Sequence, residues 1–272
     1  MQPITSLQNE RIKNAVKLRD RRGRDRQRRI IIDGVREIGL ALKSKLFIQT
    51  VFVCEELCDG PCHKVVEQAR TAGCEILTVT RPVMEKLAFG DRAGGVVAIG
   101  EPPRKSLTDL AEQLDLRQAE VEPVVAVLEG VEKPGNLGAV LRTADAAGVS
   151  AVIVANGATD LFNPNAIRAS LGSIFTVPLA AAESATILAW LRKHSFKTLA
   201  TRVDGSIDFA SAGYSGRRAI VLGSEAQGLS EVWRGDDVQA IRLPMLGSVD
   251  SLNVSATAAV LFYEALRQRR TG

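Results

Sequence analysis

From Pro123 to the end of the chain, continuously apolar runs alternate with segments whose apolar residues recur at three- and four-residue spacing. The runs are typical of strands buried on both faces of a parallel sheet. The spaced segments, such as NLGAVLRTADAAG and SATILAWLRKH, are typical of covering helices. The pattern predicts an α/β domain with a mostly parallel sheet. Its predicted strands are VVAVLEG, SAVIVAN, IFTVPL, KTLATRV, RAIVLGSE and DVQAIRLPM.

A shorter α/β alternation precedes this region. Its predicted strands are RRIII, FIQTVFVC, CEILTVT and VVAIG, and its predicted helices are GVREIGLAL and HKVVEQARTAG. Pro102 and Pro103 end the last strand, and a polar, partly helical segment follows. We therefore predict a smaller domain at residues 1–105, a linker at 106–122 and a larger domain at 123–272.

Polar and glycine-rich loops follow several predicted strands of the larger domain. Ligands of parallel α/β sheets bind at the carboxyl ends of the strands, so these loops are candidate site segments. Three of them, within PGNLGAVLRTADAAG, VLGSEAQGLS and IRLPMLGSVDSLNVS, are candidates for one cleft. The last holds more small polar residues than one helix N-cap needs. Arg142, near a predicted helix start, suits a phosphate or a developing oxyanion, and equally a surface ion pair with Asp145 or Glu132.

The 272 residues are 46% hydrophobic and 24% charged, which is typical of a globular protein with one or two domains. No apolar run approaches the ~18 residues of a membrane span, and no apolar segment follows the N-terminal charges, so we expect a cytoplasmic protein. Residues 1–105 hold 20 Lys and Arg against 13 Asp and Glu, a net charge of +7, whereas the remainder has a net charge of −3.

The positive charge peaks in KLRDRRGRDRQRR, where eight of thirteen residues are basic. A solvated helix face with Asp20 and Asp25 as local partners is one interpretation. A surface that contacts a phosphate backbone is the other, and the charge asymmetry favours it. The candidate contact residues are Arg21, Arg22, Arg24 and Arg26.

Several familiar sites are absent from the sequence. No G-x-G-x-x-G follows the first strand of either domain, and neither G-x-x-x-x-G-K-[ST] nor H-E-x-x-H occurs. The cysteine spacing does not match common zinc or iron–sulfur sites, so we expect no metal. A disulfide framework is not expected in a cytosolic chain. Cys54 ends a predicted strand and Cys74 begins one, which suits buried thiols. The cysteines are Cys54, Cys58, Cys62 and Cys74.

The three candidate loops, taken together, resemble the signature motifs of the SPOUT-class SpoU/TrmH-type RNA 2′-O-ribose methyltransferases, in the family's order. NPNAIRASLGSIFTVPL is similar to the family's intermediate segment, and the N-terminal part to its substrate-binding domain, which is like certain small ribosomal RNA-binding proteins. The resemblance implies a C-terminal α/β domain with a deep trefoil knot, S-adenosylmethionine as cofactor, and a homodimer that builds the active site across two protomers.

The resemblance also implies roles for individual residues. Arg142 would assist deprotonation of the ribose 2′-hydroxyl, supported by Asn136, and would act in the partner's cofactor pocket. Because an Arg pKa exceeds about 12, hydrogen bonding and charge stabilisation suit Arg142 at least as well as proton abstraction. Arg168 would contact phosphate. Further residues are assigned to shaping the pocket (Glu225), to orienting the RNA (Ser251, Asn253) and to binding the cofactor (Thr201, Gly223, Leu243, Leu252).

The separate N-terminal domain favours ribosomal RNA, with 23S rRNA as the expected substrate. Two alternatives stay open at this point: a tRNA 2′-O-methyltransferase, and a non-catalytic RNA-binding assembly factor that retains the knot. Retention of Asn136, Arg142 and Glu225 argues against the non-catalytic alternative. The sequence does not distinguish a housekeeping enzyme from an antibiotic-resistance enzyme.

Overall fold

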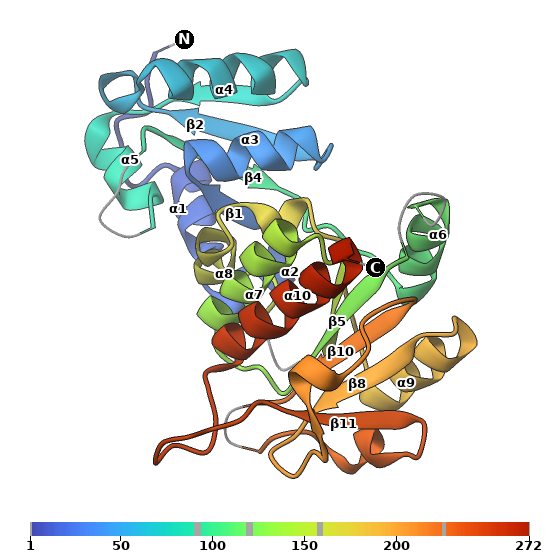
Figure 1. Ribbon diagram of the computed structural model, residues 1–272. Coiled ribbons are helices and arrows are strands. Elements are labelled where there is room, and N and C mark those ends of the chain that lie inside the picture. Colours follow the sequence, from blue (N-terminus) through green and yellow to red (C-terminus); the bar gives the residue numbers. More distant parts are fainter. Residues whose placement is uncertain (1, 90–93, 118–121, 157–159, 225–226, 272) are drawn as a thin grey trace. The chain divides into compact units, whose positions relative to one another are not determined.

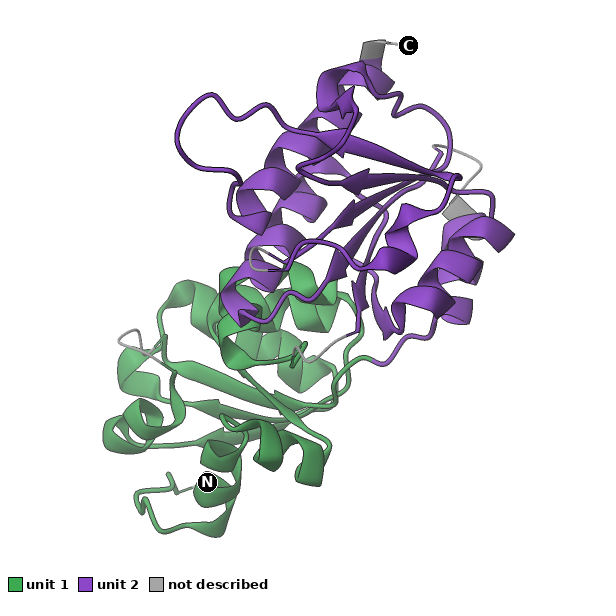
Figure 2. Cartoon of the chain, turned by 90° about the horizontal axis from the view of Figure 1, so that it is seen from below, with its two compact units in different colours: residues 1–103, 160–176 green, residues 104–159, 177–272 purple. Residues whose placement is uncertain are grey.

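The computed structural model describes residues 2–89, 94–117, 122–156, 160–224 and 227–271 (Figure 1). The chain divides into two compact units (Figure 2). Unit 1 comprises Met1–Pro103 and Asp160–Thr176, and unit 2 comprises Arg104–Thr159 and Val177–Gly272. Segment 160–176 therefore packs with the N-terminal part of the chain, although its sequence position is inside the predicted larger domain.

A four-stranded sheet forms the centre of unit 1. Its strands are β1 (Ile30–Asp33), β2 (Ile48–Val53), β3 (Glu75–Thr78) and β4 (Val96–Gly100). Their order is β1-β4-β2-β3, with β4 antiparallel to both neighbours and β3 parallel to β2. The described helices are α1 (Glu10–Lys17), α2 (Arg21–Gln27), α3 (Val35–Lys43), η1 (Glu55–Leu57), α4 (Gly60–Thr71), α5 (Arg81–Leu87), α8 (Pro164–Ala169) and η2 (Ser173–Phe175). All four predicted N-terminal strands are confirmed.

The four cysteines lie in unit 1 and do not share one state. Cys58 and Cys62 form a disulfide, while Cys54 and Cys74 are buried free thiols. The expectation of buried thiols at Cys54 and Cys74 is therefore confirmed, whereas the expectation of no disulfide is wrong for Cys58 and Cys62. A four-residue separation at the start of α4 places the Cα atoms of Cys58 and Cys62 5.2 Å apart, within the range that a disulfide spans.

Unit 2 is built on a seven-stranded sheet of order β7-β6-β5-β10-β8-β11-β9. Its strands are β5 (Val124–Glu129), β6 (Ala151–Ala155), β7 (Leu179–Ala182), β8 (Lys197–Thr201), β9 (Ile207–Asp208), β10 (Arg218–Leu222) and β11 (Val238–Arg242). Every pairing described in this sheet is parallel. The described helices are α6 (Leu107–Arg117), α7 (Pro134–Ala147), α9 (Ser184–Lys193), η3 (Phe209–Ser211), η4 (Glu231–Arg234) and α10 (Val254–Thr271). The predicted parallel α/β sheet is confirmed.

Helices cover both faces of this sheet, as the apolar runs require (Figure 1). Val125 and Val127 of β5 belong to a buried cluster with residues of α6 and α9. Because side chains alternate along a strand, the residues between them point to the opposite face, where α7 and α10 pack against each other. The helices lie on the two faces of the sheet, and the loops at the carboxyl ends of β8, β10 and β11 line a cavity.

Two predictions for this region are corrected by the structure. The run IFTVPL is not a strand: Ile174 and Phe175 lie in η2 and are buried in unit 1, and β7 begins only at Leu179. The segment 106–122, predicted as a partly helical linker, does contain a helix, α6, but it belongs to unit 2, where its Leu110 and Leu114 are buried in the core. In both segments, packing partners distant in sequence determine the conformation.

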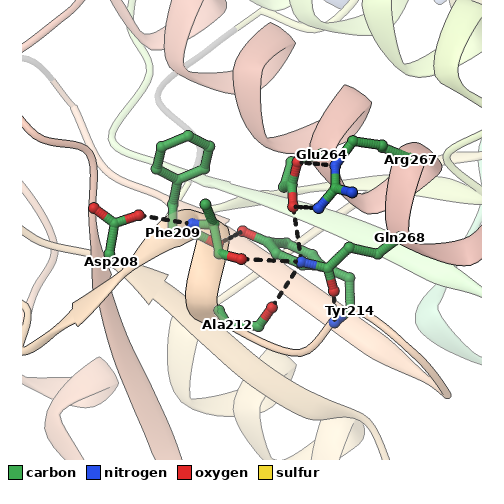
Figure 3. Close-up of polar contacts among 8 residues, drawn as sticks. Asp208, Phe209, Ala212, Tyr214, Glu264, Arg267 and Gln268 are labelled. Carbon is green, nitrogen blue, oxygen red and sulfur yellow. Dashed lines mark hydrogen bonds and ion pairs between the residues drawn. The ribbon is translucent and has the colours of Figure 1, made fainter.

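The end of α10 is fastened to the segment between β9 and β10 (Figure 3). The Gln268 amide nitrogen donates to the carbonyl of Ala212 at 3.0 Å, and its oxygen accepts from the backbone N–H of Tyr214 at 3.2 Å. The Tyr214 hydroxyl donates to the carbonyl of Phe209 at 3.1 Å. Burial raises the pKa of Tyr214, which keeps the phenol protonated as a donor. These bonds position the last helix; its predicted threading through a trefoil knot stays a prediction.

No helix in the described part of the chain is long and apolar enough to span a membrane.

Candidate active site

A cavity of about 880 Å³ opens at the carboxyl ends of β8, β10 and β11 in unit 2. Its walls come from the loops after these strands and from the start of α10. This volume lies within the usual range for cofactor and small-molecule sites. The predicted residues that line it are Thr201, Gly223, Leu243, Ser251 and Leu252. Sequence motifs about 50 residues apart therefore meet at one cavity.

The loop after β10 forms a tight turn at the cavity wall. The amide of Gly228 donates to the carbonyl of Ser224 at 3.0 Å, which closes the turn. A Cβ atom on Gly223 would lie 2.4 Å from the carbonyl carbon of Gly228, so this position requires glycine. The small residues allow a ligand to approach the backbone closely. Glu225, predicted to shape the pocket, lies outside the described residues.

An arginine–aspartate group lies on the wall formed by the loop after β8. Arg202 pairs with Asp204 through two hydrogen bonds of 2.8 and 2.6 Å, and Arg234 approaches the same carboxylate at 3.4 Å. The hydrogen bond from Arg202 lowers the pKa of Asp204 to about 2, so this carboxylate is ionised at neutral pH. The Thr201 hydroxyl donates to the carbonyl of Val221 at 3.0 Å and ties the ends of β8 and β10 together. The sequence analysis did not identify this charged group.

The polar residues before α10 have different roles in the structure. The Asn253 side-chain oxygen accepts from the backbone N–H of Ser255 at 2.9 Å, which caps the start of α10. Its amide nitrogen donates to the side-chain oxygen of Asn136 at 3.3 Å, so two predicted site residues 117 positions apart are in contact. Ser251 lines the cavity and donates to Asp250 at 3.4 Å.

Arg142 lies on the exposed side of α7 and is not among the residues that line the cavity. Asp145 and Glu132, the two acids predicted as possible ion-pair partners of Arg142, are also exposed.

Glu129, at the end of β5, is a buried acid that the sequence analysis passed over. Its side chain is 5% exposed, yet it accepts hydrogen bonds from Ser184, from Ser230 and from the indole of Trp233. Burial by itself raises the pKa of Glu129. The hydrogen bonds together lower the pKa by more than burial raises it, so the pKa of Glu129 is below its ordinary value. The available signal was a single charge at the end of the continuously apolar run VVAVLEG.

The predicted RNA-contacting arginines of unit 1 do not share one environment. Arg21, Arg22 and Arg26 are exposed on α2. Arg24 is only 5% exposed: it donates to the carbonyls of Leu18 and Arg19 at 2.6 Å and pairs with Asp160. This placement argues against the predicted phosphate contact for Arg24, because its guanidinium joins α2 to segment 160–176.

Arg168, also predicted to contact phosphate, is half-buried in unit 1. It donates to the carbonyl of Phe89, and Phe89 in turn donates its backbone N–H to Asp33 at 2.6 Å. Burial raises the pKa of Asp33, and the hydrogen bond from Phe89 and the charges of Arg168 and Arg19 offset part of that rise. Arg168 therefore has an internal electrostatic role in the structure.

Residues 123–263 match the model of the SpoU rRNA Methylase family, which is more than half of the chain. The chain belongs to this family. Residues 9–98 match the MRM3-like substrate binding domain. The family predicted from the three motifs and the expected fold class are thus confirmed.

Individual members of the SpoU family are similar along most of the chain. A 23S rRNA (guanosine-2′-O-)-methyltransferase of Bordetella pertussis is 35% identical over 224 residues, covering 82% of this chain and 90% of its own. The crystal structure of an RNA 2′-O ribose methyltransferase has a TM-score of 0.82 at 38% identity, covering 99% and 100% of the two chains. An AdoMet-bound rRNA methyltransferase from Sinorhizobium meliloti has a TM-score of 0.86 at 28% identity, covering 98% and 97%.

Proposed function

We propose that this protein transfers a methyl group from S-adenosylmethionine to a ribose 2′-hydroxyl of 23S rRNA, in the cytoplasm. The observation that carries the proposal is the convergence of family motif residues on one cavity at the carboxyl ends of β8, β10 and β11. Family membership and the AdoMet-bound and 23S rRNA-modifying relatives support the cofactor and the substrate.

The cavity fits a cofactor held mainly by backbone groups. Gly223 and Gly228 line the cavity without a side chain, and the cavity volume accommodates a ligand of nucleoside size. We assign cofactor binding to Thr201, Gly223, Leu243 and Leu252. When bound, S-adenosylmethionine supplies a methyl group on an electrophilic sulfonium.

The residues around the cavity must align and activate a weak nucleophile. We assign Arg142 to hydrogen bonding with the 2′-oxygen and to stabilising the negative charge that develops there, since a guanidinium presents several N–H donors. The hydrogen bond between Asn136 and Asn253 holds the start of α7 beside the start of α10. Ser251, exposed at the cavity, is placed to orient the RNA.

A homodimer reconciles the placement of Arg142 with this role. Arg142 is exposed and lies outside the cavity lining of its own chain. We infer that it acts in the cavity of a second protomer. Val260 and Tyr263 of α10 are exposed at 37% and 50%, which supports a partner surface on this helix.

RNA recruitment is assigned to unit 1. The exposed Arg21, Arg22 and Arg26 of α2 form a basic face suited to phosphates, and the MRM3-like substrate binding domain match covers this helix. Arg24 and Arg168 support this unit from within.

The experiment that tests the function maps 2′-O-methylation in ribosomal RNA from cells with and without the gene. We expect one 23S rRNA nucleotide to lose its 2′-O-methyl group, and the purified protein to restore it on a 23S rRNA transcript with S-adenosylmethionine. Loss of a tRNA modification instead would contradict the substrate, and an unchanged map together with no cofactor binding would contradict the enzyme.

A further inference from the structure

The buried carboxylate of Glu129 joins four separate segments of unit 2. One oxygen, Oε1, accepts from the Ser184 hydroxyl at the start of α9, from the Trp233 indole at 2.9 Å and from the Asn156 amide after β6 at 3.4 Å. The hydroxyl of Ser230 donates to the same oxygen at 2.8 Å, and its backbone N–H donates to Oε2 at 2.7 Å. β5 itself is the fourth segment.

Two of these partners flank the wall of the cavity. Ser230 directly follows Gly228 and Leu229, and Trp233 directly precedes Arg234; Gly228, Leu229 and Arg234 line the cavity. Trp233 is fully buried, so its indole holds η4 in the core while the neighbouring arginine reaches the cavity. The Glu129 carboxylate thus binds Ser230 and Trp233, which lie near the two ends of segment 228–234.

The environment of Glu129 demands a group that only accepts hydrogen bonds. The partners described for Glu129 are neutral donors: the Ser184 hydroxyl, the Asn156 amide, the Trp233 indole, and Ser230 with both its hydroxyl and its N–H. An ionised carboxylate has two acceptor oxygens and no donor. A glutamine of the same shape would turn an NH₂ group toward these donors and leave one or more of them unsatisfied.

We propose that Glu129 is a positioning residue for the cofactor: its carboxylate holds residues 228–234 in the arrangement that S-adenosylmethionine binds. Glu129 does not line the cavity and acts through Ser230 and Trp233. This inference rests on the proposed function, because it assigns the cofactor to this cavity.

The test measures S-adenosylmethionine affinity by titration calorimetry on the full-length protein. In Glu129→Gln we expect Kd to rise roughly tenfold or more, as expected when donors of a buried network lose their acceptor. Ser230→Ala keeps the carboxylate and removes one donor, and we expect a rise of about threefold. With saturating cofactor, kcat of both variants should stay within about threefold of the wild type, because no reacting group changes.

The matched control is Glu37→Gln, the same change at a buried glutamate of unit 1 that is 8% exposed. We expect it to leave Kd unchanged, so that a general loss of stability is separated from positioning. A folded Glu129→Gln with wild-type Kd would overturn the proposal. If Glu129→Gln does not fold, wild-type Kd in Ser230→Ala would overturn it. A wild-type protein that binds no S-adenosylmethionine would instead refute the proposed function.

Discussion

The buried acids of the two units differ in how their charge is compensated. In unit 2, Glu129 is surrounded by neutral donors that lower its pKa despite burial. In unit 1, burial raises the pKa of the half-buried Asp33 and of the buried Glu37, and backbone hydrogen bonds and the charges of nearby arginines offset only part of the rise. The hydrogen bonds to Glu129 outweigh the effect of burial on its pKa, whereas those to the unit 1 acids do not.

The arginines of the two units differ in a corresponding way. Unit 1 uses Arg24 internally and exposes Arg21, Arg22 and Arg26 beside it on one short helix. Unit 2 leaves Arg142 exposed on α7, outside the cavity of its own chain. We propose that unit 1 supplies RNA affinity and that unit 2 carries the chemistry, and each variant below tests one part of this proposal.

The largest effect is expected for Arg142→Ala. Methyl transfer should fall roughly a hundredfold or more, because a donor to the developing oxyanion is lost, while S-adenosylmethionine affinity should stay unchanged. Transfer of labelled methyl to 23S rRNA and titration calorimetry measure the two quantities. The matched control is Arg192→Ala. Arg192 is an exposed arginine of α9 that pairs with Asp237, and its replacement should leave activity unchanged. Retained transfer in Arg142→Ala would contradict its assignment.

Replacing Arg21, Arg22 and Arg26 together by Ala should weaken RNA binding roughly tenfold or more. The slope of log affinity against log salt should decrease by roughly 2, because phosphate contacts and released counterions are lost. RNA binding measured over a series of salt concentrations gives both quantities.

Arg24→Ala provides the contrast on the same helix. It should lower the midpoint of unfolding, because Asp160 loses its ion-pair partner, and leave the salt slope near that of the wild type. An equal loss of slope in Arg24→Ala would show that burial does not separate these arginines, and an unchanged slope in the triple variant would favour a solvated face.

The buried acids of the two units should respond to pH in opposite directions. The pKa of Glu37 is raised by burial, so its stabilising contribution is complete below the ordinary value of 4.5 and is lost as pH rises through the folded-state pKa. The pKa of Glu129 is lowered, so its contribution is complete above 4.5 and is lost as pH falls through the folded-state pKa.

Urea unfolding of wild type, Glu37→Gln and Glu129→Gln across this pH range measures the difference. From acid to neutral pH, Glu37 lowers the free energy of unfolding and Glu129 raises it. Glu37→Gln should therefore remove part of a decrease in this free energy, and Glu129→Gln should remove part of an increase. A shift of the same sign in both variants would contradict the comparison.

The smallest effect is expected for Tyr214→Phe at the fastening of α10 (Figure 3). The free energy of unfolding should fall by about 1 kcal/mol, because the carbonyl of Phe209 loses its donor. Thermal unfolding measures this free energy. A loss of cofactor affinity in Tyr214→Phe would show that the fastening also shapes the cavity.

The sequence predicted the regular parts of both units because their signals are local. Continuously apolar runs identified β5, β6, β8, β10 and β11, and helical spacing identified α7, α9 and α10. It missed β9, which has only two residues and too short a pattern to detect. The strand predicted at IFTVPL was wrong because Ile174 and Phe175 pack into the core of unit 1. Their local sequence does not show which unit they pack in.

The site residues divide along the same line. Sequence alone determined the family, through three motifs in order, and with it the glycine at 223 and the asparagines at 136 and 253 as candidates. Only the tertiary structure decided that Asn136 meets Asn253, that Arg24 turns inward to Asp160, and that Glu129 holds the wall of the cavity. Residue type and spacing are encoded locally, whereas burial and partner choice depend on contacts between segments up to 136 positions apart.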